Sequence, residues 1–218
     1  MTVEVKTIAI DGPAAAGKTV IGRQLAHSLG FRFLDTGIMY RAVTWMALRQ
    51  SVPVEDAAAI GRLAHETTIR LSGQDSDIVL VGGYEVGSQL RDPAVDGNVS
   101  LVSKVSEVRR AMVDQQRLLA AEGNIVMVGR DIGTVVLPDA DLKIFMSASA
   151  EVRARRRLQD LLAQGHAANI EQVLADTKAR DEIDSQRDDS PLVPAPDALM
   201  VDTGCRSITQ VLDLILEG

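Results

Sequence analysis

Near its N-terminal end the chain reads Thr7-Ile-Ala-Ile-Asp-Gly-Pro-Ala-Ala-Ala-Gly-Lys-Thr19. The apolar part is typical of a buried strand, and the part from Gly12 has the form G-x-x-x-x-G-K-[ST] ahead of a helical pattern. Small residues let successive backbone N–H groups converge on phosphate oxygens at the positive end of the helix. The stretch therefore predicts that the protein binds a nucleoside triphosphate with Mg²⁺.

The residues of this loop have distinct expected roles. Lys18 would reach the β- and γ-phosphates of ATP as a catalytic residue, and the Thr19 hydroxyl would be a Mg²⁺ ligand. The surrounding backbone would hold the remaining phosphate oxygens. We therefore expect ATP to contact Gly12, Pro13, Ala14, Ala15, Ala16, Gly17, Lys18, Thr19 and Val20.

Size and composition narrow the class of protein. The 218 residues suffice for one domain with a small insertion, and a net charge of −7 argues against general binding to nucleic acid or to an acidic membrane. No apolar run approaches the length that spans a bilayer. The single Cys205 excludes an internal disulfide, so we expect a reducing, cytoplasmic location and a packed, structural cysteine.

The rest of the chain alternates strand and helix patterns, which predicts an α/β protein with a parallel sheet. Ligands bind at the carboxyl ends of such strands. Expected strands after the first cover 31–34, 125–128, 142–146 and 199–202. Expected helices cover 20–29, 38–48, a segment ending near 66, 107–122 and 207–216.

Two segments depart from this alternation. Residues 67–71, 78–81 and 84–86 read as a small antiparallel meander, so we expect an insertion over about 62–102. Residues of about 151–189 hold the densest charge, with Arg153 and Arg155 to Arg157 followed by a Gly-containing loop and a second charged helix. A solvated helix face would explain such a run, but its position favours a mobile cover over the triphosphate, because guanidinium groups make forked contacts to phosphate.

Phosphoryl transfer needs in-line substrates, excluded water and positive charge around the transferred group. A phosphate acceptor needs no general base because its oxygen is already anionic, whereas a hydroxyl acceptor needs a nearby carboxylate. Asp11, Asp35 and Asp131 at strand ends leave the hydroxyl alternative open. The arginines near expected acceptor positions favour a phosphorylated acceptor: Arg41, Arg109, Arg130, Arg180 and Arg187.

Four motifs resemble those of bacterial cytidylate kinases, in the family's order and spacing over nearly the whole chain. They are the sequence from Ile8 to Thr19, Phe33-Leu-Asp-Thr-Gly-Ile-Met-Tyr-Arg-Ala42, Gly129-Arg-Asp-Ile-Gly-Thr-Val-Val136 with Pro138-Asp-Ala140, and Arg180-Asp-x-x-Asp-x-x-Arg187 with Pro191-Leu192. The last two are far more specific than a phosphate-binding loop alone.

The resemblance implies a P-loop kinase with a five-stranded parallel sheet flanked by helices, a monophosphate-binding insert at about 62–102 and an arginine-rich lid at about 151–189. The core would then comprise about 1–61, 103–150 and 190–218. It also implies transfer of the ATP γ-phosphoryl group to CMP or dCMP by a monomer in the cytoplasm.

The resemblance also assigns site residues. Thr36, Arg41, Ser100, Arg109 and Asp131 would hold the monophosphate, with Ser100 and Arg109 reading the cytosine edge. Asp131 would meet the cytosine amine or orient Arg130, and these two readings stay open. By the same resemblance, the acceptor phosphate would be bound by Arg130, Arg180 and Arg187, and the sugar hydroxyls by Asp184. The phosphoryl group under transfer would be contacted by Arg156 and Arg157 from the lid.

Two positions depart from the family pattern. Val128 stands where an acidic residue usually precedes Gly-Arg-Asp, so any part of that acid in ordering Mg²⁺ waters falls to Asp11, Asp35 or Asp131. Val20 replaces a common second hydroxyl. A kinase for another monophosphate or a small hydroxylated metabolite remains the first alternative, and a slow GTP-hydrolysing switch is disfavoured because no N-K-x-D motif occurs.

Overall fold

The computed structural model describes residues 5–73, 75–76, 78–187 and 189–217. Its centre is a five-stranded sheet in which all four strand pairs are parallel. The sheet confirms the expected architecture. In spatial order its strands are β2 (Arg32–Asp35), β6 (Ile125–Val128), β1 (Thr7–Asp11), β7 (Leu142–Ser147) and β8 (Leu199–Asp202).

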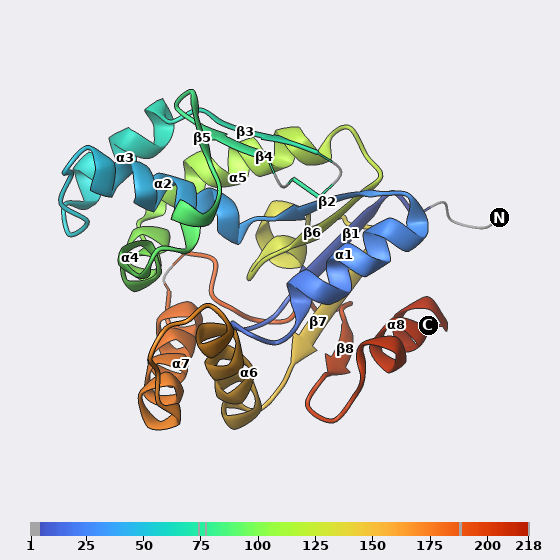
Figure 1. Ribbon diagram of the computed structural model, residues 1–218. Coiled ribbons are helices and arrows are strands. Elements are labelled where there is room, and N and C mark those ends of the chain that lie inside the picture. Colours follow the sequence, from blue (N-terminus) through green and yellow to red (C-terminus); the bar gives the residue numbers. More distant parts are fainter. Residues whose placement is uncertain (1–4, 74, 77, 188, 218) are drawn as a thin grey trace.

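Alternate side chains of the strands point into two separate cores, as a sheet covered on both faces requires. Ile8, Ile10 and Phe33 pack with α1 (Lys18–Leu29) and α8 (Ile208–Glu217), whereas Ala9 and Leu34 pack toward the opposite face. That face is covered by α2 (Gly37–Arg49) and α5 (Ser106–Ala120). Figure 1 shows α1 lying across one face of the sheet and α5 behind the other.

Close packing of α1 on the sheet depends on a glycine. A Cβ at Gly22 would lie 2.6 Å from a methyl group of Val128 and 2.9 Å from the Phe33 ring. Any larger side chain would push α1 away from β6 and β2, and with it the loop between β1 and α1. The phosphate-binding loop is thus held at the carboxyl edge of the sheet by this contact.

A second sheet of three antiparallel strands confirms the expected meander. It consists of β3 (Ile69–Ser72), β4 (Ile78–Val81) and β5 (Tyr84–Val86), and it follows α3 (Ala57–Glu66). A short 3₁₀ helix η1 (Ser88–Arg91) leads to α4 (Pro93–Ser103), which Asp92 caps through the Ala94 N–H. The expected boundary near 62 falls within α3, so the division at that residue stays a proposal.

The arginine-rich segment forms two helices, α6 (Ala150–Ala163) and α7 (Ile170–Ser185), which pack against each other. Figure 1 shows this pair beneath α4, beside the carboxyl ends of β1 and β7. Among the described residues, no helix is both long enough and apolar enough to cross a membrane.

Two expectations were wrong in detail, and one further feature was not predicted. The segment η2 (Ile132–Val136) is a π-helical turn, although its residues gave no sign of one. The long helix predicted over 107–122 ends at Ala120, because Gly123 and Asn124 take positive φ values. Cys205 is exposed rather than packed, since it lies in the turn between β8 and α8.

Candidate active site

The loop between β1 and α1 has the geometry of an anion site. Gly12 has a φ of 145°, and a Cβ there would lie 2.1 Å from the Met146 carbonyl oxygen, so only glycine fits against β7. Gly17, at the start of α1, has a φ of 95°. Within the described part of the chain no side chain caps α1. The first N–H groups of the helix therefore remain available to phosphate oxygens.

Lys18 is folded back onto this loop. Its side chain is buried, and its Nζ donates to the carbonyl oxygens of Gly12 and Pro13, each at 2.7 Å. Burial first, and then the positive charge of Arg130, lowers the pKa of Lys18 well below its ordinary value. A bound polyphosphate would relieve both effects, so the site favours an anionic ligand.

Thr19 and Asp35 form the position that best fits Mg²⁺. The Thr19 hydroxyl donates to Asp35 Oδ2 at 2.8 Å, and the other Asp35 oxygen accepts from the Gly37 N–H at 3.0 Å. A hydroxyl and a carboxylate beside the phosphate loop are hard oxygen donors of the kind that Mg²⁺ prefers. Among the described residues no group of three or more His, Cys, Asp or Glu could hold a metal. Such an ion would therefore be shared with the phosphates.

Asp11 is a buried carboxylate with a structural role. It is buried at the end of β1 and accepts from the N–H groups of Ile132 and Gly133, both at 2.7 Å. Burial raises its pKa to about 6, against the opposing effect of the two N–H donors. Asp11 thereby fixes the turn that follows β6 against the phosphate-binding loop.

This raised pKa predicts a specific pH dependence of stability. The pKa of Asp11 is about 6 in the folded state and 3.8 as an ordinary aspartate in the unfolded chain. Between these two pH values the native state therefore binds more protons than the unfolded state does. The free energy of unfolding of the parent chain, relative to Asp11→Asn, should fall by roughly 3 kcal/mol from pH 3.5 to pH 7. Urea titrations of both chains measure it, and a difference that is flat or rises with pH would contradict the assignment.

Arginine–aspartate pairs connect the turn after β6 to α5, and connect it to the C-terminal part of α7. Arg109 Nη2 donates to Asp131 Oδ2, and both side chains are buried. Asp184 accepts from Arg130 Nε at 2.8 Å and forms an ion pair with Arg187 at 3.3 Å. Arg130 is thus held by Asp184, whereas Asp131 holds Arg109. The part of Asp131 in nucleotide binding stays a prediction.

Arg180 stands apart in this cluster. Among the described residues it has no hydrogen bond or ion pair, and it lies near two other guanidinium groups, those of Arg130 and Arg41. Burial, together with these like charges, lowers its pKa to about 10. Asp184 and Asp96 are near enough to oppose this shift, but neither forms an ion pair with Arg180. A guanidinium that lies among others without an ion pair of its own is a favourable position for an incoming anion.

The two predicted lid arginines diverge. Arg156 Nη2 donates to the Thr203 carbonyl oxygen at 2.6 Å, and Nη1 approaches the Ala15 carbonyl at 3.4 Å, so this side chain lies against the phosphate-binding loop. Arg157 instead pairs with Asp96 of α4, which also pairs with Arg41. Arg156 therefore faces the expected ATP side of the site, and Arg157 faces the expected monophosphate side.

Two predicted binding residues are less clearly placed at the cluster. Thr36 is buried, and its hydroxyl donates to the Val128 carbonyl at 2.9 Å, which ties the end of β2 to the end of β6. Ser100 is half-buried on α4, and its carbonyl accepts from Ser103, whose own carbonyl accepts from Arg109. Nucleotide contacts of Thr36 and Ser100 stay predictions.

Sequence reasoning missed several residues of the site. Arg153 is buried, forms a two-pronged ion pair with Asp181 at 2.6 and 2.9 Å, and reaches the Ala14 carbonyl at 3.4 Å. The Thr203 hydroxyl donates to the Ala16 carbonyl. Asp96 joins Arg41 to Arg157. The charge run had included Arg153, but an acid in the first turn of a helix is too common to single out Asp96.

The sequence was compared with known protein families and with individual proteins. The sequence profile of the family described as Cytidylate kinase matches residues 8–218. The chain belongs to the cytidylate kinase family. Among proteins of that name, one from Desulforamulus reducens is 45% identical over 98% of this chain and 96% of its own length. Another, from Geobacillus kaustophilus, is 46% identical over 97% of this chain and 95% of its own.

Similarity to solved structures supports the fold alone. An uncharacterized protein from Eubacterium ventriosum has a TM-score of 0.55 and 12% sequence identity, and covers 98% of this chain and 97% of its own. Residues 8–218, which match the cytidylate kinase family, contain every site residue discussed above.

Proposed function

We propose that this protein transfers the γ-phosphoryl group of ATP to CMP or dCMP, giving ADP and CDP or dCDP. The observation that carries this proposal is the group of buried and half-buried guanidinium side chains near the phosphate-binding loop. An unpaired Arg180 beside Arg130 and Arg41 suits a second phosphate facing the first. Membership of the cytidylate kinase family supports cytidine monophosphate as the acceptor.

The reaction requires no proton-removing side chain. The second pKa of a phosphate monoester is about 6, so the CMP phosphate is mostly dianionic at neutral pH and its oxygen is already a nucleophile. A bond forms between that oxygen and the γ-phosphorus, the bond from the γ-phosphorus to the bridging oxygen breaks, and ADP departs. Lys18, Arg156 and Arg157 would stabilise the charge that moves between the two phosphates.

Base recognition is proposed for the buried pair of Arg109 and Asp131. The guanidinium can donate to the acceptors of the cytosine ring, with Ser100 beside it, while the free oxygen of Asp131 accepts from the exocyclic amine. A wrong base would leave these buried groups unpaired, which costs binding free energy. Arg130, Arg180 and Arg187 would hold the acceptor phosphate together with Arg41, and Asp184 the sugar hydroxyls.

Mg²⁺ would be held by Thr19 and by the phosphates of ATP. When bound, it neutralises charge on the β- and γ-phosphates. With Val128 at the usual acidic position, Asp35 is the carboxylate we propose for the ordering of its water ligands, because Asp35 is the register partner of Val128 and contacts Thr19. We also propose that the enzyme acts in the cytoplasm as a monomer.

An acceptor panel tests the proposal. With ATP and Mg²⁺, CMP and dCMP should have kcat/KM values at least about 100-fold above those of AMP, GMP and shikimate, because each unmatched buried polar group costs 1–3 kcal/mol. UMP carries a carbonyl in place of the amine and a proton on N3, so it tests recognition of this edge of the base by Asp131 and Arg109 together. A different best acceptor would overturn the substrate assignment.

A further inference from the structure

Asp96 occupies an unusual position for an acid. It projects from the first turn of α4 and pairs with arginines from two other elements, Arg41 of α2 and Arg157 of α6. Arg41 Nη2 lies 2.5 Å from Asp96 Oδ1, and Arg157 Nη2 donates to Oδ2. Arg41 also donates to the Leu90 carbonyl oxygen at 3.0 Å. One carboxylate therefore joins the acceptor side of the site to the lid.

The surroundings keep this carboxylate ionised. Burial alone would raise its pKa, but the pKa of Asp96 is lowered because Arg41, Arg157 and, more weakly, Arg180 outweigh that effect. Only 19% of its side chain is exposed. Two guanidinium groups that would otherwise repel each other are thus held around one anion.

A negative charge on Asp96 should weaken phosphate binding at this site. Arg41 and Arg157 are both assigned above to phosphates, and an aspartate between them repels an incoming dianion and competes for its donors. An acid that only capped α4 would not need to be buried between them, since Asp92 already caps that helix. We therefore expect the benefit of Asp96 to come from the positions in which it holds Arg41 and Arg157.

We propose that Asp96 is a positioning residue that fixes the lid arginine Arg157 against Arg41, so that Arg157 meets the transferred phosphoryl group while Arg41 holds the acceptor phosphate. The inference rests on the proposed function. Asp96 touches no reacting atom in this account and acts through its two arginines. Asp96 links α4 to α6 through Arg157, which lies 61 residues further along the chain. Closure of the lid and placement of the acceptor therefore become a single event.

The test is the separation of kcat from KM in Asp96→Ala. Loss of the anchor should misplace Arg157 and lower kcat roughly 10- to 100-fold. The KM for CMP should stay level or fall, because a repulsive charge has been removed, and the KM for ATP should not change. Asp160→Ala, an exposed acid on α6, is the matched control and should leave all three values unchanged.

Two further variants separate positioning from folding. Asp96→Glu keeps the charge and should recover part of the lost kcat, and Asp96→Asn serves if Asp96→Ala fails to fold. In an Arg157→Ala background, Asp96→Ala should cost far less than it does alone. A raised KM for CMP with unchanged kcat, or losses that multiply in the double variant, would overturn the proposal. Should the parent enzyme prefer another acceptor, the substrate assignment fails, while the same variants still test Asp96 with that acceptor.

Discussion

Lys18→Ala should lower kcat for CMP phosphorylation by about three orders of magnitude. The Lys18 ammonium group is buried beside the phosphate-binding loop, where its charge interacts with phosphate in a medium of low dielectric constant. In the free protein it is held by two carbonyl oxygens, and this ready position is lost with the side chain. Steady-state kinetics at saturating ATP and CMP measure the effect.

Lys104→Ala is a matched control for this variant. Lys104 is exposed at the end of α4, so its removal should leave kcat unchanged. Circular dichroism should show that both variants keep the parent secondary structure. Normal turnover in a folded Lys18→Ala variant would mean that the loop between β1 and α1 is not the donor site.

Arg180→Ala should raise the KM for CMP by about 100-fold while the KM for ATP changes little. A forked pair of charge-assisted hydrogen bonds to phosphate contributes about 3 kcal/mol, or two powers of ten. Because Arg180 lies near Arg130 and Arg41 and makes no hydrogen bond or ion pair among the described residues, its loss should not lower the melting temperature of the free protein. Initial rates with each substrate varied in turn, and a thermal melt, measure both effects.

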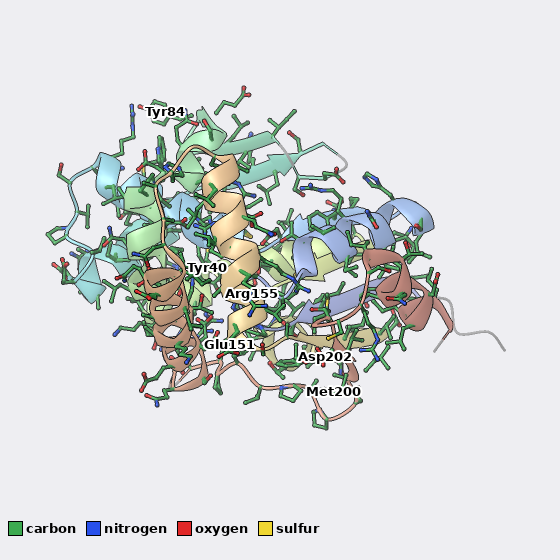
Figure 2. All side chains as sticks on the ribbon, turned by 60° about the horizontal axis from the view of Figure 1, so that its bottom comes forward. Tyr40, Tyr84, Glu151, Arg155, Met200 and Asp202 are labelled. Carbon is green, nitrogen blue, oxygen red and sulfur yellow. The ribbon has the colours of Figure 1, made fainter. Side chains whose placement is uncertain are left out.

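Arg155→Ala provides the control for Arg180. Arg155 lies on α6, one turn after Glu151, and is exposed (Figure 2). Its removal takes away the same charge from the same helix pair without touching the buried cluster, so neither KM should change. Equal losses of ATP and CMP use in Arg180→Ala would place Arg180 between the two sites rather than on the acceptor phosphate.

The strands were predictable because their buried residues are apolar and often branched, and they occur between clear turn residues. Each of the four predicted strands after β1 matches the structure to within one residue at either end. The π-helical turn of η2 was not predictable, since Ile132-Gly-Thr-Val-Val136 has the composition of a strand. Its conformation depends on Asp11, which holds its first two N–H groups from 121 and 122 residues away.

The sequence predicted which residues form the candidate site, but it did not predict which acidic side chain pairs with which arginine. The motifs contain Arg130, Asp131 and Asp184, and the family resemblance adds Arg109. Which acid meets which arginine, however, depends on how α5 and α7 pack beyond the sheet. Arg130 meets Asp184 across 54 residues and Arg157 meets Asp96 across 61. No local pattern encodes such distances, and Asp96 itself looked like an ordinary helix-start acid.

The central claim is that CMP and ATP are held phosphate to phosphate by guanidinium groups, without a general base. A crystal structure of the protein with CMP bound tests it most directly. The account predicts the CMP phosphate within hydrogen-bond distance of Arg180 and Arg130, and its base beside Arg109 and Asp131. A CMP phosphate bound away from Arg180 and Arg130 would contradict the account.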